Sequence, residues 1–273
     1  MAVKRRKFGS GHAYYVDGEK VPGVTTILKM CPNTALVGWA GRVTAEYALD
    51  FWDELAEVKP SERLKRMQAA RFDIRDKAAR RGTEVHKIAE RLVAGDEVTV
   101  PDELAGHVEA YRDWLDAVEP VPVATELVVA SRTNRYCGTA DLIADLPPVM
   151  IGPELVPAAR WLLELKTTAS GVWPESALQA TGYRRAEVYV HPEHPEDEQP
   201  MDLLGIERAG VVWIKSDVAE LRPVDTSDEL WDFFLHLRWL FDRMELDANR
   251  NLRLPSHWIG TAATAAELVA ARA

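Results

Sequence analysis

The chain of 273 residues has little cysteine and no long apolar segment. Its two cysteines, Cys31 and Cys137, are too few for a zinc or iron–sulfur site with four thiolate ligands. No apolar run approaches the roughly 18 residues of a transmembrane helix, and the basic N-terminus is not followed by the apolar core of a signal peptide. These absences predict a soluble cytoplasmic protein without a membrane partner, in which both thiols stay reduced.

The chain also lacks an excess of positive charge, because 33 Lys and Arg stand against 43 Asp and Glu, a net charge of -10. The charge is unevenly distributed, since residues 62–91 hold ten Lys or Arg and only five acids. A local basic stretch can bind phosphates on an acidic protein, and Arg75, Arg80 and Arg81 are candidates. The alternative is an ordinary solvated helix face.

Hydrophobic residues at 47% and charged residues at 28% are typical of a globular chain and exclude disordered, collagen-like and coiled-coil proteins. The length favours one compact domain. We expect four regions along it: an N-terminal hairpin and arm over 1–30, a helical region over 31–120, a strand-rich core over 121–225, and C-terminal helices and a tail over 226–273.

Hydrophobic periodicity predicts the elements within these regions. Asp17-Gly18 predicts a hairpin turn, and helices are expected from near residue 34, from Pro60 and from Pro101. A further helix is expected from Pro174 to about Val190, before an acidic, proline-rich surface loop over 191–200. Strands are expected over 123–130, 136–146, 160–167, 209–215 and 219–224. This order predicts an α/β or α+β fold with a helical N-terminal half.

Two segments in the strand-rich core carry the chemistry. Side chains alternate along a strand, so Glu164 and Lys166 share one face, and Asp141 on the preceding strand can face the same way. Two carboxylates beside an ammonium group suit Mg²⁺ or Mn²⁺ and phosphodiester cleavage. The strand around Glu164 is apolar, where unpartnered charges would be costly. The alternative is a strand exposed on one face, with both charges solvated.

Other polar residues fall at helical spacing near these segments. Gln179 and Tyr183 lie four residues apart, hence on one helix face, where they can contact a phosphate or a base, with Arg184 beside them. In isolation such a pair is more often a surface amide and a half-buried phenol. His86 flanks an apolar helical stripe, with Glu90 one turn on; a histidine there is also commonly a structural residue.

Four motifs occur in one order, and together they resemble the PD-(D/E)XK nuclease superfamily, in its RecB-like, phage-type exonuclease branch. They are Gly82-Thr83-x-x-His86, Gly138-Thr139-x-Asp141, Glu164-x-Lys166 and Gln179-x-x-x-Tyr183. The sequence departs from the superfamily pattern at Ala140, where many members have proline. The resemblance implies a restriction-endonuclease-like core, a central mixed sheet flanked by helices, with its motifs within residues 82–183.

The resemblance also implies roles for individual residues. His86, Asp141, Glu164 and the main-chain carbonyl of Leu165 would bind Mg²⁺ or Mn²⁺, and Lys166 would be the catalytic lysine. Gln179 and Tyr183 would position DNA, with Arg184, Arg75, Arg80 and Arg81 as further DNA contacts, while Glu126 and Glu90 would be supporting acids. No iron–sulfur cluster is expected.

The implied activity is a metal-dependent DNA exonuclease in recombination, repair or phage DNA processing, located in the host cytoplasm if phage-encoded. Single- or double-stranded DNA ends are the expected substrate, and a single-strand annealing protein or recombinase is a candidate partner. Oligomerisation is left open. Two alternatives stand beside this hypothesis: a structure-specific endonuclease with the same site, and a non-catalytic DNA-binding or assembly protein on a nuclease scaffold.

Overall fold

The computed structural model describes residues 2–9, 11–32, 34–246 and 252–253. The N-terminus forms an antiparallel sheet of three strands, β1 (Val3–Phe8), β2 (Gly11–Val16) and β3 (Glu19–Val21). The predicted turn is confirmed, because Asp17 and Gly18 both have positive φ, 52° and 88°. Strand β1 was not predicted. The short helix α1 (Val24–Ile27) and a 3₁₀ turn (Leu28–Met30) follow.

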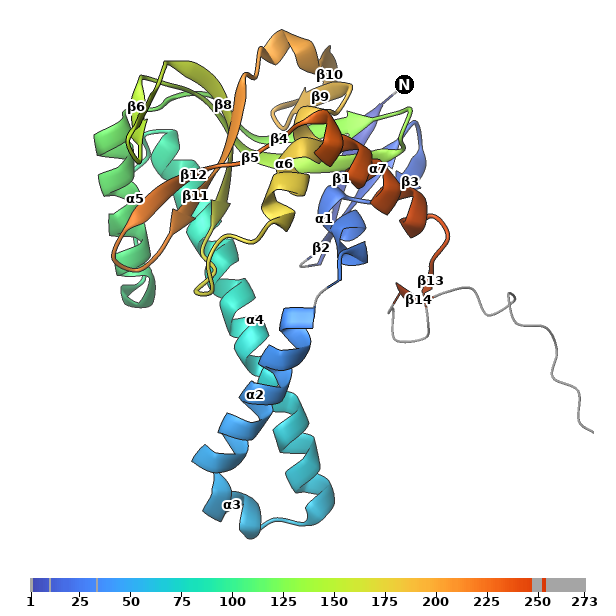
Figure 1. The fold of residues 1–273 in the computed structure, drawn as a ribbon, viewed down its shortest axis with the longest axis vertical. Coiled ribbons are helices and arrows are strands. Elements are labelled where there is room, and N and C mark those ends of the chain that lie inside the picture. The colour runs from blue at the N-terminus through green and yellow to red at the C-terminus, as the bar shows by residue number, and fades with distance from the viewer. Residues whose placement is uncertain (1, 10, 33, 247–251, 254–273) are drawn as a thin grey trace, which may run out of the picture.

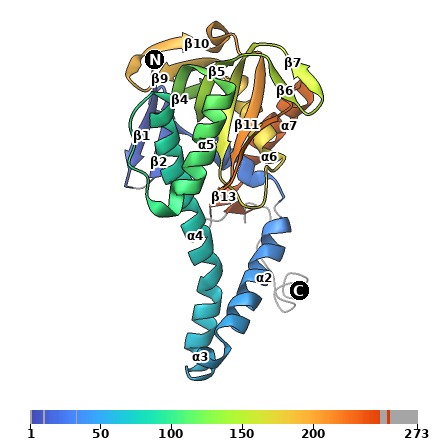
Figure 2. The ribbon, with the colours of Figure 1, turned by 90° about the vertical axis from the view of Figure 1, so that its left-hand side faces the viewer.

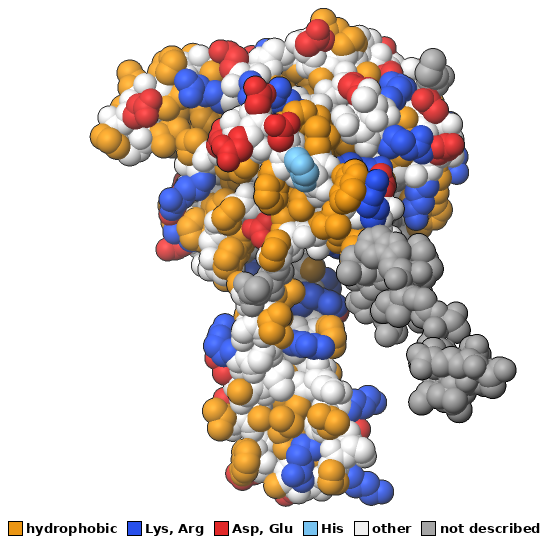
Figure 3. All heavy atoms as spheres, turned by 45° about the vertical axis from the view of Figure 1, so that its right-hand side comes forward, with side chains coloured by type: hydrophobic (Ala, Val, Ile, Leu, Met, Phe, Trp, Pro, Cys, Tyr) orange, Lys and Arg blue, Asp and Glu red, His pale blue; other side chains and the backbone are white. Residues whose placement is uncertain are grey.

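Three helices form an arm that projects from the body, namely α2 (Thr34–Asp50), α3 (Trp52–Ala56) and α4 (Pro60–Val93) (Figures 1 and 2). Helix α4 begins at Pro60 as predicted, and its 34 residues give it a length of roughly 50 Å. Apolar side chains are exposed along the arm, among them Val37, Leu49 and Trp52, interspersed with Lys and Arg (Figure 3). None of the helices in the described ranges is both long and apolar enough to span a membrane.

The body is built on a mixed sheet of seven strands in the order β10-β9-β4-β5-β8-β11-β12. Only β8 and β11 pair in parallel, and the other neighbours are antiparallel. The strands are β4 (Val121–Ser131), β5 (Tyr136–Leu146), β8 (Ala159–Lys166), β9 (Val188–His191), β10 (His194–Pro200), β11 (Arg208–Ile214) and β12 (Ala219–Pro223). A small hairpin, β6 (Val149–Ile151) and β7 (Glu154–Val156), lies between β5 and β8.

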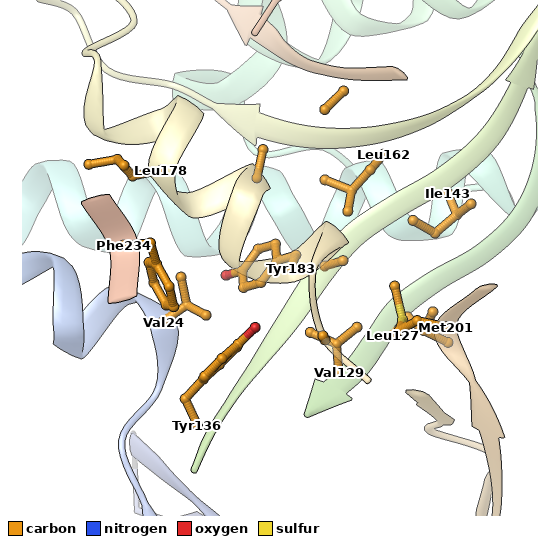
Figure 4. Packing of buried hydrophobic residues seen from close by; sticks show 14 of the residues in the cluster. Val24, Leu127, Val129, Tyr136, Ile143, Leu162, Leu178, Tyr183, Met201 and Phe234 are labelled. Atoms are coloured by element: carbon orange, nitrogen blue, oxygen red, sulfur yellow. The ribbon is translucent and has the colours of Figure 1, made fainter. Parts of the chain in front are cut away.

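Helices cover both faces of this sheet, so the predicted mixed α/β architecture with a central mixed sheet flanked by helices is confirmed. One face packs on α1, α6 (Glu175–Arg184) and α7 (Asp228–Phe241) through a core that includes Leu162, Tyr183 and Phe234 (Figure 4). The other face packs on α4 and α5 (Ala105–Val118), which follows a 3₁₀ turn (Asp102–Leu104). Alternation along each strand supplies apolar side chains to both cores.

The predictions for residues 185–200 were wrong. The helix ends at Arg184 instead of near Val190, because Glu187 donates its amide to the Ala130 carbonyl of β4 and β9 joins the sheet. The predicted loop contains the edge strand β10, where prolines and acids are tolerated because one side of the strand needs no partner. A 3₁₀ turn (Met201–Leu204) leads to β11.

The last described residues form a short pair of strands, β13 (Glu245–Leu246) and β14 (Leu252–Arg253). The tail expected at the end of the region 226–273 lies outside the described residues.

Candidate active site

Asp141 and Glu164 lie where two neighbouring strands stop pairing. The β5–β8 ladder ends at Leu142 opposite Leu163, so Asp141 and Glu164 occupy the next position. There the Leu165 amide donates to the Asp141 carboxylate, with 2.8 Å between N and Oδ2. A side-chain oxygen therefore replaces the backbone acceptor that a continuing ladder would supply.

This interruption also places the main-chain oxygen that was predicted as a metal ligand outside the β5–β8 ladder. In a strand the amide and the carbonyl of one residue point to the same side. The Leu165 carbonyl consequently faces the side of Asp141, beyond the last paired residues of β5 and β8. It is placed to act as a third oxygen donor beside the two carboxylates.

Glu164 is buried, with 1% of its surface exposed, and its two oxygens differ. Oε2 accepts hydrogen bonds from Lys166 Nζ at 2.9 Å and from Gln179 Nε2 at 2.6 Å, whereas buried Oε1 has no hydrogen-bond partner. Burial, and next the charge of Asp141, raise the pKa of Glu164 to about 7. Burying a carboxylate oxygen without a hydrogen-bond partner costs folding free energy, and a cation bound to Oε1 would compensate this cost.

Helix α4 brings His86 to the same place. Its Nδ1 lies 3.6 Å from Asp141 Oδ2. Burial opposes protonation of His86, but the Asp141 carboxylate outweighs it and raises the pKa of the imidazole. Burial likewise opposes ionisation of Asp141, yet His86 and then Lys166 hold the pKa of its carboxyl below the usual value.

The Lys166 ammonium completes the cluster of charged groups. Burial lowers its pKa, but Glu164 and Asp141 raise it more, so the net shift is upward. Within the residues that the structure describes, no three His, Cys, Asp or Glu side chains form a ready metal-binding group. In this arrangement Lys166 and Gln179 hold one oxygen of Glu164, and its free oxygen, Oε1, is the atom left for a cation.

Gln179 and Tyr183 lie on one face of α6, as predicted, but both side chains are buried. Gln179 donates to the Tyr183 hydroxyl at 3.0 Å and accepts from Lys166 Nζ at 3.0 Å. Gly138 lets the Tyr183 ring pack directly on β5, since a Cβ at that position would overlap ring carbons. Gln179 therefore holds Glu164 and Lys166, Tyr183 holds Gln179, and both side chains line the cleft above the acids.

The predicted arginines lie away from this cluster. Arg184 donates to the Ile206 carbonyl and to Thr226 Oγ1, on the other side of α6. On α4, Arg75 pairs with Asp76, and Arg75 and Arg80 are exposed on the helix. None of the four predicted arginines, Arg75, Arg80, Arg81 and Arg184, lines the cleft over the acids.

That cleft has a volume of about 960 Å³ and is walled by β1–β2, the C-terminal half of α4 and the turn after β9. At its floor, Glu126 of β4 lies opposite Asp141, between the pairs Thr125–Leu142 and Leu127–Ala140. Glu126 has a φ of 51°, which interrupts this ladder too, and it pairs with Arg5 at 2.9 Å. Glu90 also lines the cleft, and burial, followed by the charge of Glu126, raises its pKa.

The contribution of β1 and β2 was missed from the sequence. The Tyr14 hydroxyl is hydrogen bonded to Thr139 Oγ1 at 2.8 Å, which ties β2 to β5 two residues before Asp141. The basic run from Lys4 to Lys7 is visible in the sequence, but it carries no sign of a partner more than 100 residues away, as in the Arg5–Glu126 pair.

In comparisons with known proteins, no family model and no curated protein matched this chain. The likeness to the PD-(D/E)XK superfamily thus consists of the four short motifs. Function has to be inferred from the geometry and chemistry of the site, since one fold supports many activities.

Proposed function

We propose that this protein is a divalent-metal-dependent deoxyribonuclease. The observation that carries the proposal is the pair of carboxylates at the strand interruption, of which Glu164 leaves one buried oxygen, Oε1, without a partner. A lysine two residues along the same strand and an imidazole on the facing helix stand beside it. Metal-dependent hydrolysis of a phosphodiester uses groups of these kinds gathered around the phosphate that is attacked.

The residues present fit Mg²⁺ or Mn²⁺. Asp141, Glu164 and the Leu165 carbonyl offer hard oxygen donors, and His86 adds a nitrogen that Mn²⁺ accepts more readily. When bound, such an ion polarises a phosphoryl oxygen and lowers the pKa of a bound water.

The remaining residues position the reacting groups. The Leu165 amide holds Asp141, and Gln179 holds both Glu164 and Lys166. The Lys166 ammonium, with its side chain 25% exposed, reaches the cleft, where it orients the attacking water or stabilises charge on the phosphate. Fixing these groups before substrate arrives lowers the cost of reaching the transition state.

The exonuclease assignment follows from the resemblance to the RecB-like branch, and so do recombination, repair or phage DNA processing as its setting. An endonuclease would use the same groups, and only its products differ. A non-catalytic scaffold is disfavoured, because the acids, the lysine and the imidazole are all in place.

The test is to incubate end-labelled linear DNA and covalently closed circular DNA with Mg²⁺ or Mn²⁺. An exonuclease releases nucleotides from the linear DNA and leaves the circle intact, whereas an endonuclease nicks the circle. EDTA should stop either reaction, and Asp141→Asn is the inactive control. Binding of DNA without any cleavage in either metal would identify the scaffold protein instead.

A further inference from the structure

The N-terminal hairpin presents one face to the acids of the cleft. In the β1–β2 register Arg5 pairs with Tyr14 and Lys7 pairs with His12, so these four side chains share a face. The Arg5–Glu126 ion pair and the Tyr14–Thr139 hydrogen bond fix this face over β4 and β5. The hairpin therefore forms one wall of the cleft, and residues of α4 line another part of it.

This wall makes the cleft cationic in a protein of net charge -10. Six Lys or Arg line the cleft against four acids, and β1 supplies four of the six. The lining cations are Lys4, Arg5, Arg6, Lys7, Lys87 and Lys166, and the acids are Glu90, Glu126, Asp141 and Glu164. Strand β1 thus reverses the sign of the charge at the place where a polyanion would have to approach.

The cations of β1 are not equally engaged with protein partners. Arg5 is paired with Glu126, and the Arg6 guanidinium lies over the Tyr15 ring, 4.8 Å from its centroid. Lys4 and Lys7 are exposed, and neither ammonium has an ion pair or side-chain hydrogen bond within the described chain. Lys87, on the opposite wall, is paired with Glu84. Lys7 on the cleft face, and Lys4 and Arg6 on the opposite face of this edge strand, therefore have no acidic partner in the described chain and can bind a ligand.

We propose that the edge strand β1 is the binding site for the DNA backbone beside the phosphate that is cleaved, with Lys7 binding a phosphate from the cleft face of the strand and Lys4 and Arg6 binding phosphates from its opposite face. This inference rests on the proposed nuclease function and replaces the basic stretch of α4 as the expected path of the DNA. Lys4 and Arg6 share a face and are about 7 Å apart along an extended strand, which matches about two nucleotide steps of 3.4 Å.

An acidic peptide would meet the same cations but fits the cleft less well. Four acids line the cleft that β1 borders, and they would repel the carboxylates all along an acidic peptide. A phosphodiester backbone approaching the same floor is the substrate for which a divalent ion between Asp141 and Glu164 compensates the repulsion.

The experiment compares two triple variants with the wild type. Lys4→Gln, Arg6→Gln and Lys7→Gln remove the free cations of β1 and keep the Arg5 anchor. Lys65→Gln, Arg71→Gln and Lys77→Gln remove three exposed charges from α4, outside the cleft. Binding of fluorescent single- and double-stranded oligonucleotides is measured by anisotropy in Ca²⁺, from 50 to 200 mM salt, and melting temperatures report whether each variant folds.

The β1 variant should bind about tenfold more weakly at 50 mM salt, and its salt slope should fall by about 0.7–0.9 for each phosphate that is no longer neutralised. The α4 variant should stay within about twofold of the wild type. Lys4→Arg with Lys7→Arg, which keeps the charges, should retain affinity. Comparing the single-stranded with the double-stranded oligonucleotide shows which of the two forms of DNA binds to β1.

Two results would overturn the inference, and they differ in what else they overturn. If the wild type cuts DNA but the β1 variant binds like the wild type, or loses no more affinity than the α4 variant, β1 is not the backbone site and the nuclease proposal survives. If the wild type neither binds nor cuts DNA with Mg²⁺ or Mn²⁺, both proposals fail together.

Discussion

The Asp141 carboxylate accepts a hydrogen bond from the Leu165 amide at the position where the β5–β8 ladder ends, and so replaces the backbone acceptor of a paired strand. The Asp141 side chain thereby has a structural role and an electrostatic role. Its oxygen satisfies a buried backbone donor, and its charge faces His86 and Lys166 across the cleft floor. A substitution can separate these two roles, because the neutral amide of asparagine can accept the hydrogen bond but carries no charge.

Asp141→Asn should keep the stability of the fold and lose metal binding, whereas Asp141→Ala should lose metal binding and part of the stability. The alanine variant leaves the Leu165 amide without an acceptor, which costs about 1–3 kcal/mol of unfolding free energy. Chemical denaturation gives the stabilities, and calorimetric titration with Mn²⁺ gives metal affinity. Undiminished Mn²⁺ affinity in both variants would contradict the assignment of Asp141 as a ligand.

Glu164→Gln should stabilise the metal-free protein above pH 7. The pKa of Glu164 is raised to about 7, so between about pH 4.5 and pH 7 the folded state keeps a proton that the unfolded state releases. The free energy of unfolding of the wild type therefore falls as pH rises through this window. Glutamine cannot ionise, and at pH 8 its advantage should be on the order of 1–3 kcal/mol, vanishing near pH 4.5.

Adding Mg²⁺ or Mn²⁺ should make the wild type more stable than Glu164→Gln, because a bound ion stabilises the folded state of the protein that binds it. The measurement is a melting curve at pH 5, 6, 7 and 8 with and without the ion. A wild type that melts above Glu164→Gln at pH 8 in EDTA would show that the unpartnered Oε1 is not a cost to the fold.

Lys166→Gln should lower kcat by about 10²–10⁴-fold and leave DNA affinity within about twofold. The ammonium lies between Glu164 and Gln179, where it can act on the water or on the phosphate but is not part of the outer wall of the cleft. Single-turnover rates at saturating enzyme separate the two effects. Weak binding with an unchanged saturated rate would make Lys166 a phosphate anchor.

Gly138→Ala should destabilise the protein and reduce activity together. The new methyl group would overlap the Tyr183 ring, and overpacking of this kind costs typically about 1–3 kcal/mol. Displacing Tyr183 also loosens Gln179, which holds Glu164 and Lys166. Gly41→Ala in α2 is the matched control, since its Cβ meets no atom within 4 Å and alanine favours the helix. Equal melting temperatures of both variants would contradict the packing described.

Local patterns predicted the parts of the fold whose residues carry their own signal. The Asp17-Gly18 turn, the start of α4 at Pro60 and the core strands β4, β5 and β8 were predicted from period and punctuation. Strand β9 was not, because Val188–His191 follows a helix without a breaker, and only pairing with β4 decides its conformation. Strand β10 was not predicted either, because it is an edge strand and its prolines give the sequence pattern of a loop.

The candidate site shows the same division. Alternation along a strand predicted that Glu164 and Lys166 share a face, and helical spacing predicted that Gln179 and Tyr183 do. Their depth could not be predicted, because it depends on α6 packing against β5 at Gly138. The wall formed by β1 depends on long-range pairs such as Arg5–Glu126, which no local pattern encodes.

Helix α4 is one continuous element with two environments, and amide hydrogen exchange should divide it. Near its C-terminal end Val85 and Ala89 are buried against the sheet, whereas residues 71–80 are almost entirely exposed on the arm. Protection of an amide follows the free energy of the opening that exposes it. The arm should therefore exchange through local unfolding while the turns around His86 exchange only with the core, so that a boundary near Gly82 separates two cooperative units within a single helix.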